Sequence, residues 1–227
     1  DKGQTLRTIL DVLTGANESE LDGLELSEES REALENRLNY AVGYKVIRSC
    51  DFGIPQNGER VYIVGFDRDY YGDVDFDEAF SWPLPYAVEA RVGSILEESS
   101  LLPDKYTISQ RLYDGHIRRK QEHRNKGNGF GFSVFSAESP YTNTISARYY
   151  KDGSEILIDQ SHLGKRPRKL TPRECARLQG YPQEFIVDAV SDVQIYKQFG
   201  NSVSVPVITE LARSMLNFDR DLAQRGA

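Results

Sequence analysis

The chain has few of the features that mark secreted or membrane proteins. Only two of its 227 residues are cysteines, Cys50 and Cys175, so we expect no disulfide framework and a reducing cytoplasm as the compartment. No apolar run approaches the roughly 18 residues that a membrane-spanning helix requires, and the first residues lack a signal-peptide pattern. We therefore expect no membrane partner, and we interpret both thiols as buried structural groups.

Charge is distributed unevenly along the chain. A net charge of −7, with 39% hydrophobic and 28% charged residues, is ordinary for a globular protein. Residues 103–173, however, hold 14 lysines and arginines against 7 aspartates and glutamates, whereas the whole chain has 28 and 35. This basic region predicts a surface that faces phosphates, while the acidic remainder keeps the protein soluble.

The first part of the chain is predicted to form two helices followed by two strands. Apolar residues at helical spacing indicate the helices, and β-forming residues on either side of a turn indicate the strands. The helices are expected over 5–13, ending at Gly15, and over 30–40 after an acidic loop; the strands are expected over 44–50 and 60–66. Pro83 and Pro85 then discourage regular structure and mark a domain boundary.

The basic region is predicted to be a small, mixed, mostly β unit. Its elements are a helix around 109–124 and strands over 144–150 and 155–159, joined by a hairpin turn at 151–154. A further helix should begin after Thr171 and run to about Gly180, because a capping threonine is followed by Pro172 and Glu174. A last amphipathic helix is expected over 204–217.

Three blocks that lie far apart in the chain occur in one order. They run from Phe52 to Phe66 (FGIPQNGERVYIVGF), from Arg168 to Tyr181 (RKLTPRECARLQGY) and from Tyr196 to Val203 (YKQFGNSV). Taken singly, each has an ordinary interpretation: a solvated turn, an amphipathic helix with surface arginines and a helix cap. Together, they resemble the last three conserved blocks of the DNA (cytosine-5) methyltransferases.

The resemblance implies an α/β fold. It indicates the C-terminal part of a Rossmann-like methyltransferase domain, dependent on S-adenosylmethionine, with an inserted and mostly β target-recognition domain. On this basis residues 1–80 are the distal part of the catalytic domain, residues 81–167 are the target-recognition domain, and residues 168–227 return to the catalytic domain with closing helices. The expected cofactor is S-adenosylmethionine, and no metal is expected.

The first block implies contacts with the reacting base. Arg60 matches the family's arginine that contacts the flipped cytosine and the adjacent backbone, and Gln56 opens the same pattern, so both are candidates for the catalytic site. Arginine suits this task because its permanent charge and several donors can hold a carbonyl oxygen and a phosphate together. The family's middle arginine is Gly58 here, which removes one expected cationic contact.

The other two blocks imply structural and cofactor-binding roles. Arg173 and Arg177, in the second block, look like structural organisers. In the third block, Gly200 can take an unusual backbone angle, and Gly200, Asn201 and Ser202 are the residues implied to contact S-adenosylmethionine. An amide and a hydroxyl at a helix start can bind the zwitterionic end of that cofactor.

The basic region resembles the recognition domain of the Dcm and EcoRII branch, which implies a CC-N-GG-like or CCGG-like duplex as target, with the inner cytosine methylated. The candidate DNA contacts are Arg118, Arg119, Lys126, Arg148 and Lys151. A merely solvated charged helix is the alternative interpretation of the first three. The glycine-rich segment 127–132 follows a predicted helix and not a strand, so it is not a nucleotide-binding loop.

Three parts that the family requires are missing from this sequence: a Pro-Cys nucleophile, a Glu-Asn-Val acid and a glycine-rich cofactor loop. In the family mechanism the cysteine thiolate attacks C6 of a flipped cytosine, the glutamate protonates N3, and C5 then takes the methyl group. Cys175 is expected inside a helix and Cys50 on a strand. Neither follows a proline, so neither is the nucleophile.

We therefore interpret the chain, which starts at Asp1 and not at methionine, as the C-terminal portion of a cytosine-5 DNA methyltransferase. It is expected to be active once joined to its N-terminal portion, covalently or as a separate chain. By itself it should bind duplex DNA weakly and transfer no methyl groups. Two alternatives are left open: a DNA-binding specificity subunit without chemistry, and an inactive remnant, for which Gly58 is the only local sign.

Overall fold

The computed structural model describes residues 3–15, 27–29, 38–127 and 131–225. These residues form two compact units. Unit 1 comprises residues 1–46, 61–83 and 211–227 wherever they are described, and unit 2 comprises residues 47–60 and 84–210. Each unit has its own buried core.

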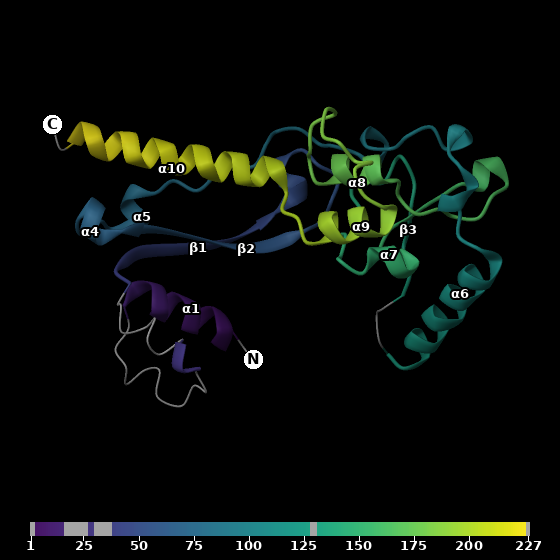
Figure 1. Cartoon of the computed structure of the whole chain (residues 1–227), viewed down its shortest axis with the longest axis horizontal. Coiled ribbons are helices and arrows are strands. Elements are labelled where there is room, and N and C mark those ends of the chain that lie inside the picture. Colours follow the sequence, from purple (N-terminus) through teal and green to yellow (C-terminus); the bar gives the residue numbers. More distant parts are fainter. Residues whose placement is uncertain (1–2, 16–26, 30–37, 128–130, 226–227) are drawn as a thin grey trace. The chain divides into compact units, whose positions relative to one another are not determined.

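Unit 1 contains two strands and several helices (Figure 1). The elements with residues in this unit are α1 (Gln4–Thr14), β1 (Tyr40–Arg48), β2 (Glu59–Asp67), α4 (Arg68–Tyr71), α5 (Phe76–Ala79) and α10 (Val205–Arg225). Strands β1 and β2 form a two-stranded sheet, as their β-branched and aromatic residues predict. Helix α1 ends at Gly15, which has φ 80°, a left-handed conformation that favours glycine.

An aromatic cluster forms the core of unit 1. The ring of Phe66 on β2 stacks on Phe218 of α10 with centroids 3.7 Å apart, which holds α10 alongside the sheet (Figure 1). Phe76 and Phe80 pack around the same ring. Gly43 on β1 leaves room for Phe76, since a β-carbon at residue 43 would lie 2.1 Å from that ring. Burying each phenylalanine contributes about 1.5–3 kcal/mol of stability.

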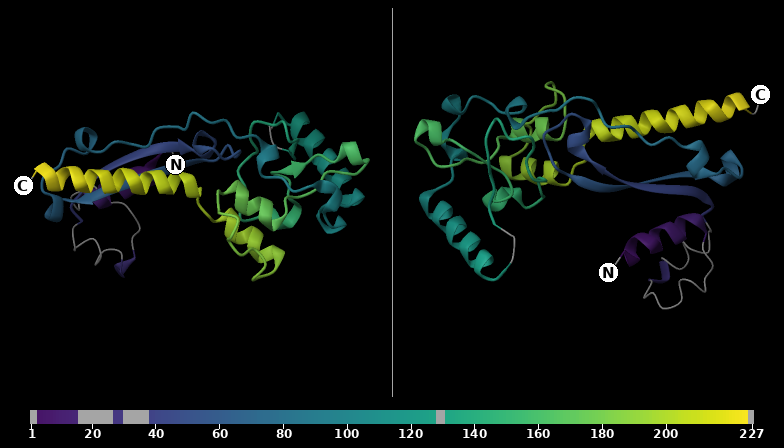
Figure 2. Two further views of the ribbon diagram at one scale, coloured as in Figure 1. Left: turned by 90° about the horizontal axis from the view of Figure 1, so that it is seen from above. Right: turned by 180° about the vertical axis from the view of Figure 1, so that it is seen from behind.

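Unit 2 consists of short helices and long irregular segments with little strand. Its elements are η1 (Ser49–Phe52), η2 (Val92–Ser94), η3 (Ser99–Leu101), η4 (Asp104–Tyr106), α6 (Gln110–Asn125), β3 (Val134–Phe135), α7 (Tyr149–Asp152), β4 (Leu157–Ile158), η5 (Ser161–Leu163), α8 (Pro172–Leu178), α9 (Asp192–Gly200) and the start of α10. Strands β3 and β4 pair in parallel, with Val134 opposite Leu157. Helix α9 packs against α7 and α8, whereas α6 projects from the rest of the unit (Figure 2).

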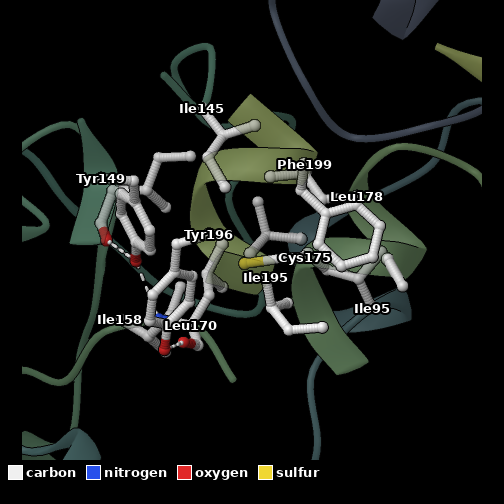
Figure 3. Packing of buried hydrophobic residues seen from close by; sticks show 13 residues of the cluster. Ile95, Ile145, Tyr149, Ile158, Leu170, Cys175, Leu178, Ile195, Tyr196 and Phe199 are labelled. Atoms are coloured by element: carbon white, nitrogen blue, oxygen red, sulfur yellow. Dashed lines mark hydrogen bonds between the residues drawn. The ribbon is translucent and has the colours of Figure 1, made fainter. Parts of the chain in front are cut away.

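The core of unit 2 lies where α7, α8 and α9 meet (Figure 3). Tyr149 Oη accepts from the backbone nitrogen of Leu170 at 2.8 Å and donates to the backbone oxygen of Ile156 at 2.7 Å. Tyr196 Oη donates to the backbone oxygen of Leu170 at 2.6 Å. Because both buried hydroxyls have partners, this core gains the burial of two aromatic rings without leaving their polar groups unsatisfied.

Most of the predicted helices are confirmed, as are the first two strands. Helices α1, α6, α8 and α10 and strands β1 and β2 lie at the predicted positions. Helix α8 begins with the predicted capping box: Thr171 Oγ1 accepts from the Glu174 backbone nitrogen, and the Glu174 carboxylate accepts from the Thr171 backbone nitrogen. The helix predicted over 30–40 and the loop before it lie largely outside the described residues. No helix of the described residues is long and apolar enough to cross a membrane.

The predicted hairpin over 144–159 is wrong. Residues 144–148 are irregular, α7 follows at Tyr149, and the predicted turn is the end of α7, where Gly153 has φ 64°. Burial of the Tyr149 ring in the core overrides the β propensity of this segment. Within the described part of residues 81–167, regular strand is limited to the two-residue β3 and β4, so this region is mixed and not mostly β.

The position of Cys50 also differs from the prediction. Cys50 lies in η1, directly after β1, and is half-buried, whereas Cys175 is buried inside α8 as expected.

The packing of unit 2 does not follow the predicted domain bounds, because residues 168–210 pack together with residues 84–167. The predicted bounds of 1–80, 81–167 and 168–227 refer to functional domains and stay a prediction.

Candidate functional site

Two buried glutamines join the three sequence blocks inside unit 2, and we call this arrangement the glutamine junction. Gln56, in the first block, is 2% exposed, and its Nε2 donates to Oε1 of Gln179 in the second block at 3.2 Å. Gln179 Nε2 donates in turn to the backbone oxygen of Phe199, in the third block, at 2.8 Å. Gln56 Oε1 accepts from the backbone nitrogen of Ile145 at 2.9 Å. Segments that are distant in sequence therefore meet through one chain of hydrogen bonds.

Two glycines allow backbones to approach closely beside the glutamine junction. Gly180 has φ 79°, and a β-carbon there would lie 2.4 Å from Pro206. A β-carbon at Gly200 would lie 2.2 Å from the backbone carbonyl of Ser146. Gly200 is the last residue of α9 and does not have positive φ, so the prediction of an unusual backbone angle is wrong. Close packing against residue 146 is what requires glycine at this position.

A buried ion pair holds the start of the second block. Arg168 Nη1 and Nη2 donate to the two carboxylate oxygens of Glu174 at 2.7 and 2.8 Å, and both side chains are at most 1% exposed. Arg168 Nε also donates to Ser99 Oγ at 3.1 Å, and the carboxylate accepts from the backbone nitrogens of Thr171 and Glu97. Both charges are thus surrounded by partners, as burial requires. Sequence analysis missed this role of Arg168, although Glu174 was visible as a capping residue.

The other two arginines of the second block contact nearby backbone, as structural organisers would. Arg177 Nη1 donates to the backbone oxygen of Ile95 at 3.2 Å, and its Nε and Nη2 donate to Gln183 Oε1. Arg173 Nη2 donates to the backbone oxygen of Phe185 at 2.9 Å. These contacts tie α8 to the segments before and after it.

The two candidates for the catalytic site differ in accessibility. Arg60 is exposed at the start of β2, and its Nη1 donates to the backbone oxygen of Glu59 at 3.2 Å. Both the nitrogen and the oxygen of the Gln56 amide form hydrogen bonds within the glutamine junction, so Gln56 braces the loop that leads into β2 and Arg60. Gly58, between them, is buried, and a β-carbon there would lie 3.2 Å from Ser49 Oγ. A long cationic side chain at residue 58 would therefore require Ser49 to move.

A basic cavity in unit 2 brings together three of the five predicted DNA contacts. Arg119 on α6, Arg148 before α7 and Lys151 on α7 all line a cavity of about 460 Å³. Its lining residues are His116, Arg119, His123, Gly131, Phe132, Asn143, Arg148, Lys151, Asp152, Ser154 and Glu155. Arg118, on α6, and Lys126, directly after α6, are exposed and do not line the cavity. We refer to this feature as the basic cavity.

Charged and titratable groups meet on one wall of the basic cavity. Arg119 Nη2 donates to Asp152 Oδ2 at 3.2 Å and lies 2.9 Å from His116 Nδ1. Burial lowers the pKa of His116, against the opposing charge of Asp152. Burial alone would raise the pKa of Asp152, but hydrogen bonds from Ser154 and Arg119 hold it below its ordinary value. At neutral pH the wall therefore carries a neutral imidazole beside an ion pair.

Comparison with known proteins identifies the family. The model of C-5 cytosine-specific DNA methylases matches residues 27–217. The chain belongs to this family. It is 50% identical over 219 residues to the type II methyltransferase M1.ScrFI of Lactococcus lactis subsp. cremoris, covering 95% of this chain and 48% of that relative. It is 54% identical over 180 residues to M.SsoII of Shigella sonnei, covering 79% of this chain and 45% of that relative.

The solved structure of the S. pombe Dnmt2 methyltransferase is similar in fold, with a TM-score of 0.61 at 20% identity over 95% of this chain and 72% of that one. The predicted class, an α/β chain forming part of a Rossmann-like methyltransferase, is thereby confirmed. The chain spans about half the length of the curated relatives just named. The cofactor of this methyltransferase family is S-adenosylmethionine, as predicted.

The loop between α9 and α10 fits the family's cofactor in part. Asn201 is exposed, so its amide offers one donor and one acceptor group to a ligand. Ser202 Oγ shares a hydrogen bond with Tyr181 Oη at 2.8 Å, so its hydroxyl is held in place by the second block. Gly200 acts through backbone packing, as described above. The assignment of Asn201 and Ser202 as cofactor contacts stays a prediction.

Neither thiol of the chain fits the family's nucleophile. Burial raises the pKa of Cys175 well above its ordinary value, and Cys175 is 0% exposed. Burial also raises the pKa of Cys50, against the opposing charge of Arg48. A cysteine nucleophile requires a lowered pKa and access to substrate, and neither thiol meets both requirements.

Proposed function

We propose that this chain is the C-terminal portion of a DNA (cytosine-5) methyltransferase that acts on a CC-N-GG-like or CCGG-like duplex. The observation that carries the proposal is the glutamine junction, which joins all three family blocks in a chain that spans about half of its curated relatives. The sequence contains no Pro-Cys and no Glu-Asn-Val. The nucleophile and the acid would therefore come from an N-terminal portion, linked covalently or supplied as a separate chain.

The reaction requires the target cytosine to leave the duplex. A stacked base exposes neither face of its ring, and flipping it out costs a few kcal/mol that contacts with the protein must offset. Arg60 would contact the flipped cytosine, and Gln56 would hold in place the loop that precedes β2 and Arg60, from inside the glutamine junction. When bound, S-adenosylmethionine supplies the methyl group. Asn201 and Ser202 would bind one side of that cofactor.

The basic region would position the duplex. Arg118 on α6 and Lys126 directly after α6 are both exposed; they would contact phosphates and contribute to affinity that weakens with salt. Arg119, Arg148 and Lys151 converge on the basic cavity, where side chains could reach base edges. This division follows the general pattern in which phosphate contacts orient a protein on DNA and base contacts select its sequence.

Complementation tests the proposal. The chain would be mixed with the N-terminal portion of M1.ScrFI, the part of that relative that precedes the matched region, and tritiated methyl transfer to a CC-N-GG duplex would be measured. We expect transfer by the mixture and none by either part alone. An N-terminal portion in which the Pro-Cys cysteine is alanine is the matched control. Robust transfer by the 227-residue chain alone would contradict the proposal.

A DNA-binding specificity subunit without chemistry is the second candidate, because the basic cavity lies entirely within unit 2. Selective binding to the duplex without transfer in any mixture would support it. An inactive remnant predicts neither selective binding nor transfer. Methyl transfer by the wild-type mixture separates the first candidate from the second, and under the first candidate the Arg60→Ala variant should abolish that transfer.

A further inference from the structure

One face of the β1–β2 sheet in unit 1 is apolar and only partly covered. Successive residues of a strand point to opposite faces of a sheet. The residues on this face are Tyr40, Val42, Tyr44 and Val46 of β1 and Val61, Ile63 and Gly65 of β2. Both sets share the face, because a β-carbon at Gly65 would lie 3.3 Å from the side chain of Tyr40 and 3.5 Å from that of Val42. We call it the open sheet face.

Three apolar side chains of the open sheet face are strongly exposed, whereas the opposite face is covered. Tyr44, Val46 and Val61 are 51%, 55% and 49% exposed. On the opposite face, Val64 and Phe66 of β2 are buried, and the ring of Phe66 stacks on α10 as described above. The two faces of one sheet therefore differ in cover although both are apolar.

The sequence of these strands is that of a sheet with both faces covered. Apart from Lys45, residues 40–46 and 61–66 are all apolar or aromatic. Strands of a sheet that faces water on one side alternate between apolar and polar residues, whereas strands covered on both faces are apolar throughout. The residue pattern therefore indicates a covering partner for the open sheet face.

Helix α1 lies on the side of the sheet away from α10 (Figures 1 and 2), but it covers the open sheet face incompletely. Its apolar residues Leu6, Ile9, Leu10 and Leu13 recur at helical spacing. No residue of α1, which the structure describes from end to end, is buried, and Ile9 is 42% exposed. Because a helix gains most of its stability by packing its apolar face, α1 also has apolar surface available to a partner.

The missing half of the relatives is the partner that fits this surface best. A two-stranded sheet is at best marginally stable in water by itself. The matched region is 48% of M1.ScrFI and 45% of M.SsoII, so about half of each relative lies outside it and can supply the cover. A second copy of this chain fits less well. The sequence segments of unit 1 hold 18 acidic against 9 basic residues, so two copies would repel each other.

We propose that the open sheet face docks the N-terminal portion of the methyltransferase, with Tyr44 as its anchor. The inference rests on the proposed function, because that portion is the partner invoked there; it adds which surface of this chain the partner covers. The open sheet face carries no charged side chain between residues 40 and 46 or 61 and 65, so the partner would present apolar side chains to it. Buried aromatic residues near the centre of an interface usually contribute most to its affinity.

Nitration of tyrosines tests the contact without any substitution. The chain would be co-expressed with the N-terminal portion of M1.ScrFI and purified as a complex. Nitration by tetranitromethane would then be followed by peptide mass spectrometry in the complex and in the isolated chain. Tyr44 should be nitrated in the isolated chain and lose most of its reactivity in the complex. Tyr70, 79% exposed on α4, is the reference and should react equally in both.

Two variants measure the contribution of the open sheet face to affinity. Tyr44→Thr removes the ring but keeps a residue suited to a strand, and Val46→Glu places a charge in the proposed contact. Each should raise the Kd for the N-terminal portion about tenfold or more, as truncation of a central interface residue does. The matched controls are Tyr70→Thr and Val88→Glu, which change exposed residues elsewhere and should leave the Kd within about twofold.

The kinetics of methyl transfer separate docking from chemistry and from misfolding. Neither Tyr44 nor Val46 is a candidate for contact with the base, the cofactor or the DNA. At saturating concentrations of the N-terminal portion, both variants should therefore reach the wild-type kcat. A misfolded variant would not recover in this way, and urea unfolding of each isolated variant checks its fold.

The outcomes distinguish failure of this inference from failure of the proposed function. If wild type assembles and transfers methyl groups, but Tyr44 keeps its reactivity in the complex or both variants keep wild-type affinity, the docking surface is wrong and the proposed function stands. Tyr44 that is protected in the isolated chain also overturns the inference: light scattering would then assign the cover to a second copy in a dimer, or to another segment of the chain in a monomer. If wild type neither assembles nor transfers, the proposed function fails and the inference with it.

Discussion

Truncating Glu174 measures how strongly the buried ion pair holds unit 2 together. The Glu174→Ala variant leaves the guanidinium of Arg168, which is 1% exposed, without its charge partner. It also removes the acceptor of the backbone nitrogens of Thr171 and Glu97. Breaking a buried pair by removing one partner costs about 3–5 kcal/mol. Since domains usually have a stability of only about 5–15 kcal/mol, we expect a loss of about 4 kcal/mol that brings unit 2 close to unfolding.

Urea unfolding followed by far-UV circular dichroism measures this loss. The chain has one tryptophan, Trp82, which lies in unit 1. Tryptophan fluorescence therefore reports on the unfolding of unit 1, and Glu174→Ala should change it less than it changes the circular dichroism signal. Glu122→Ala, which removes an exposed i,i+4 partner of Arg118, is the matched control and should cost no more than about 0.5 kcal/mol. If the free energy of unfolding falls with urea concentration at the same slope in the variants and in wild type, the two-state comparison of their stabilities holds.

The double variant Arg168→Met with Glu174→Leu separates the pair from packing. It removes both charges, so it should be more stable than Glu174→Ala, because apolar residues of similar size can replace a buried pair at little cost. The reasoning would be refuted by a loss below about 1 kcal/mol in Glu174→Ala, or by a double variant whose loss equals the sum of the single losses.

Three further outcomes are expected. Gly200→Ala should lower the free energy of unfolding in urea by about 1–3 kcal/mol, because its β-carbon would lie 2.2 Å from a facing backbone carbonyl. Gly115→Ala is the control: nothing lies within 4 Å of its β-carbon, so it should stabilise α6 by about 0.5–1 kcal/mol. Gln56→Leu should cost about 1–3 kcal/mol, since it leaves buried partners unpaired; a neutral effect would contradict the glutamine junction. Burial raises the pKa of both thiols, so labelling with iodoacetamide, followed by peptide mass spectrometry, should be slow for Cys50 and become faster only at a pH above its ordinary pKa. Cys175 should be labelled only in urea. Rapid labelling of Cys175 in the native protein would contradict its burial.

Elements governed by neighbours in sequence were predictable. The start of α8 followed from Thr171, Pro172 and Glu174, which interact within one helical turn. The hairpin over 144–159 was not, because Tyr149 has high β propensity but packs into the core with its hydroxyl between Leu170 and Ile156. Strand propensity depends on tertiary context, and that context lay outside the segment.

The candidate site divides in the same way. The family blocks, the basic surplus and the exposed position of Arg60 could be inferred from residue types and their order. The role of Gln56 could not, because its amide pairs with Gln179, a residue 123 positions away. The packing requirement at Gly200 likewise depends on residue 146, which no spacing rule connects to it.

The sequence by itself determined the family, the α/β class, the main helices and the location of the basic surplus. Only the tertiary structure decided which buried polar groups find which partners: Arg168 with Glu174, Gln56 with Gln179, and the buried His116 with the exposed Arg119. The physical reason is the range of the forces involved. Propensity and capping act over about four residues, whereas a buried polar group must find its partner wherever folding brings one within hydrogen-bond distance.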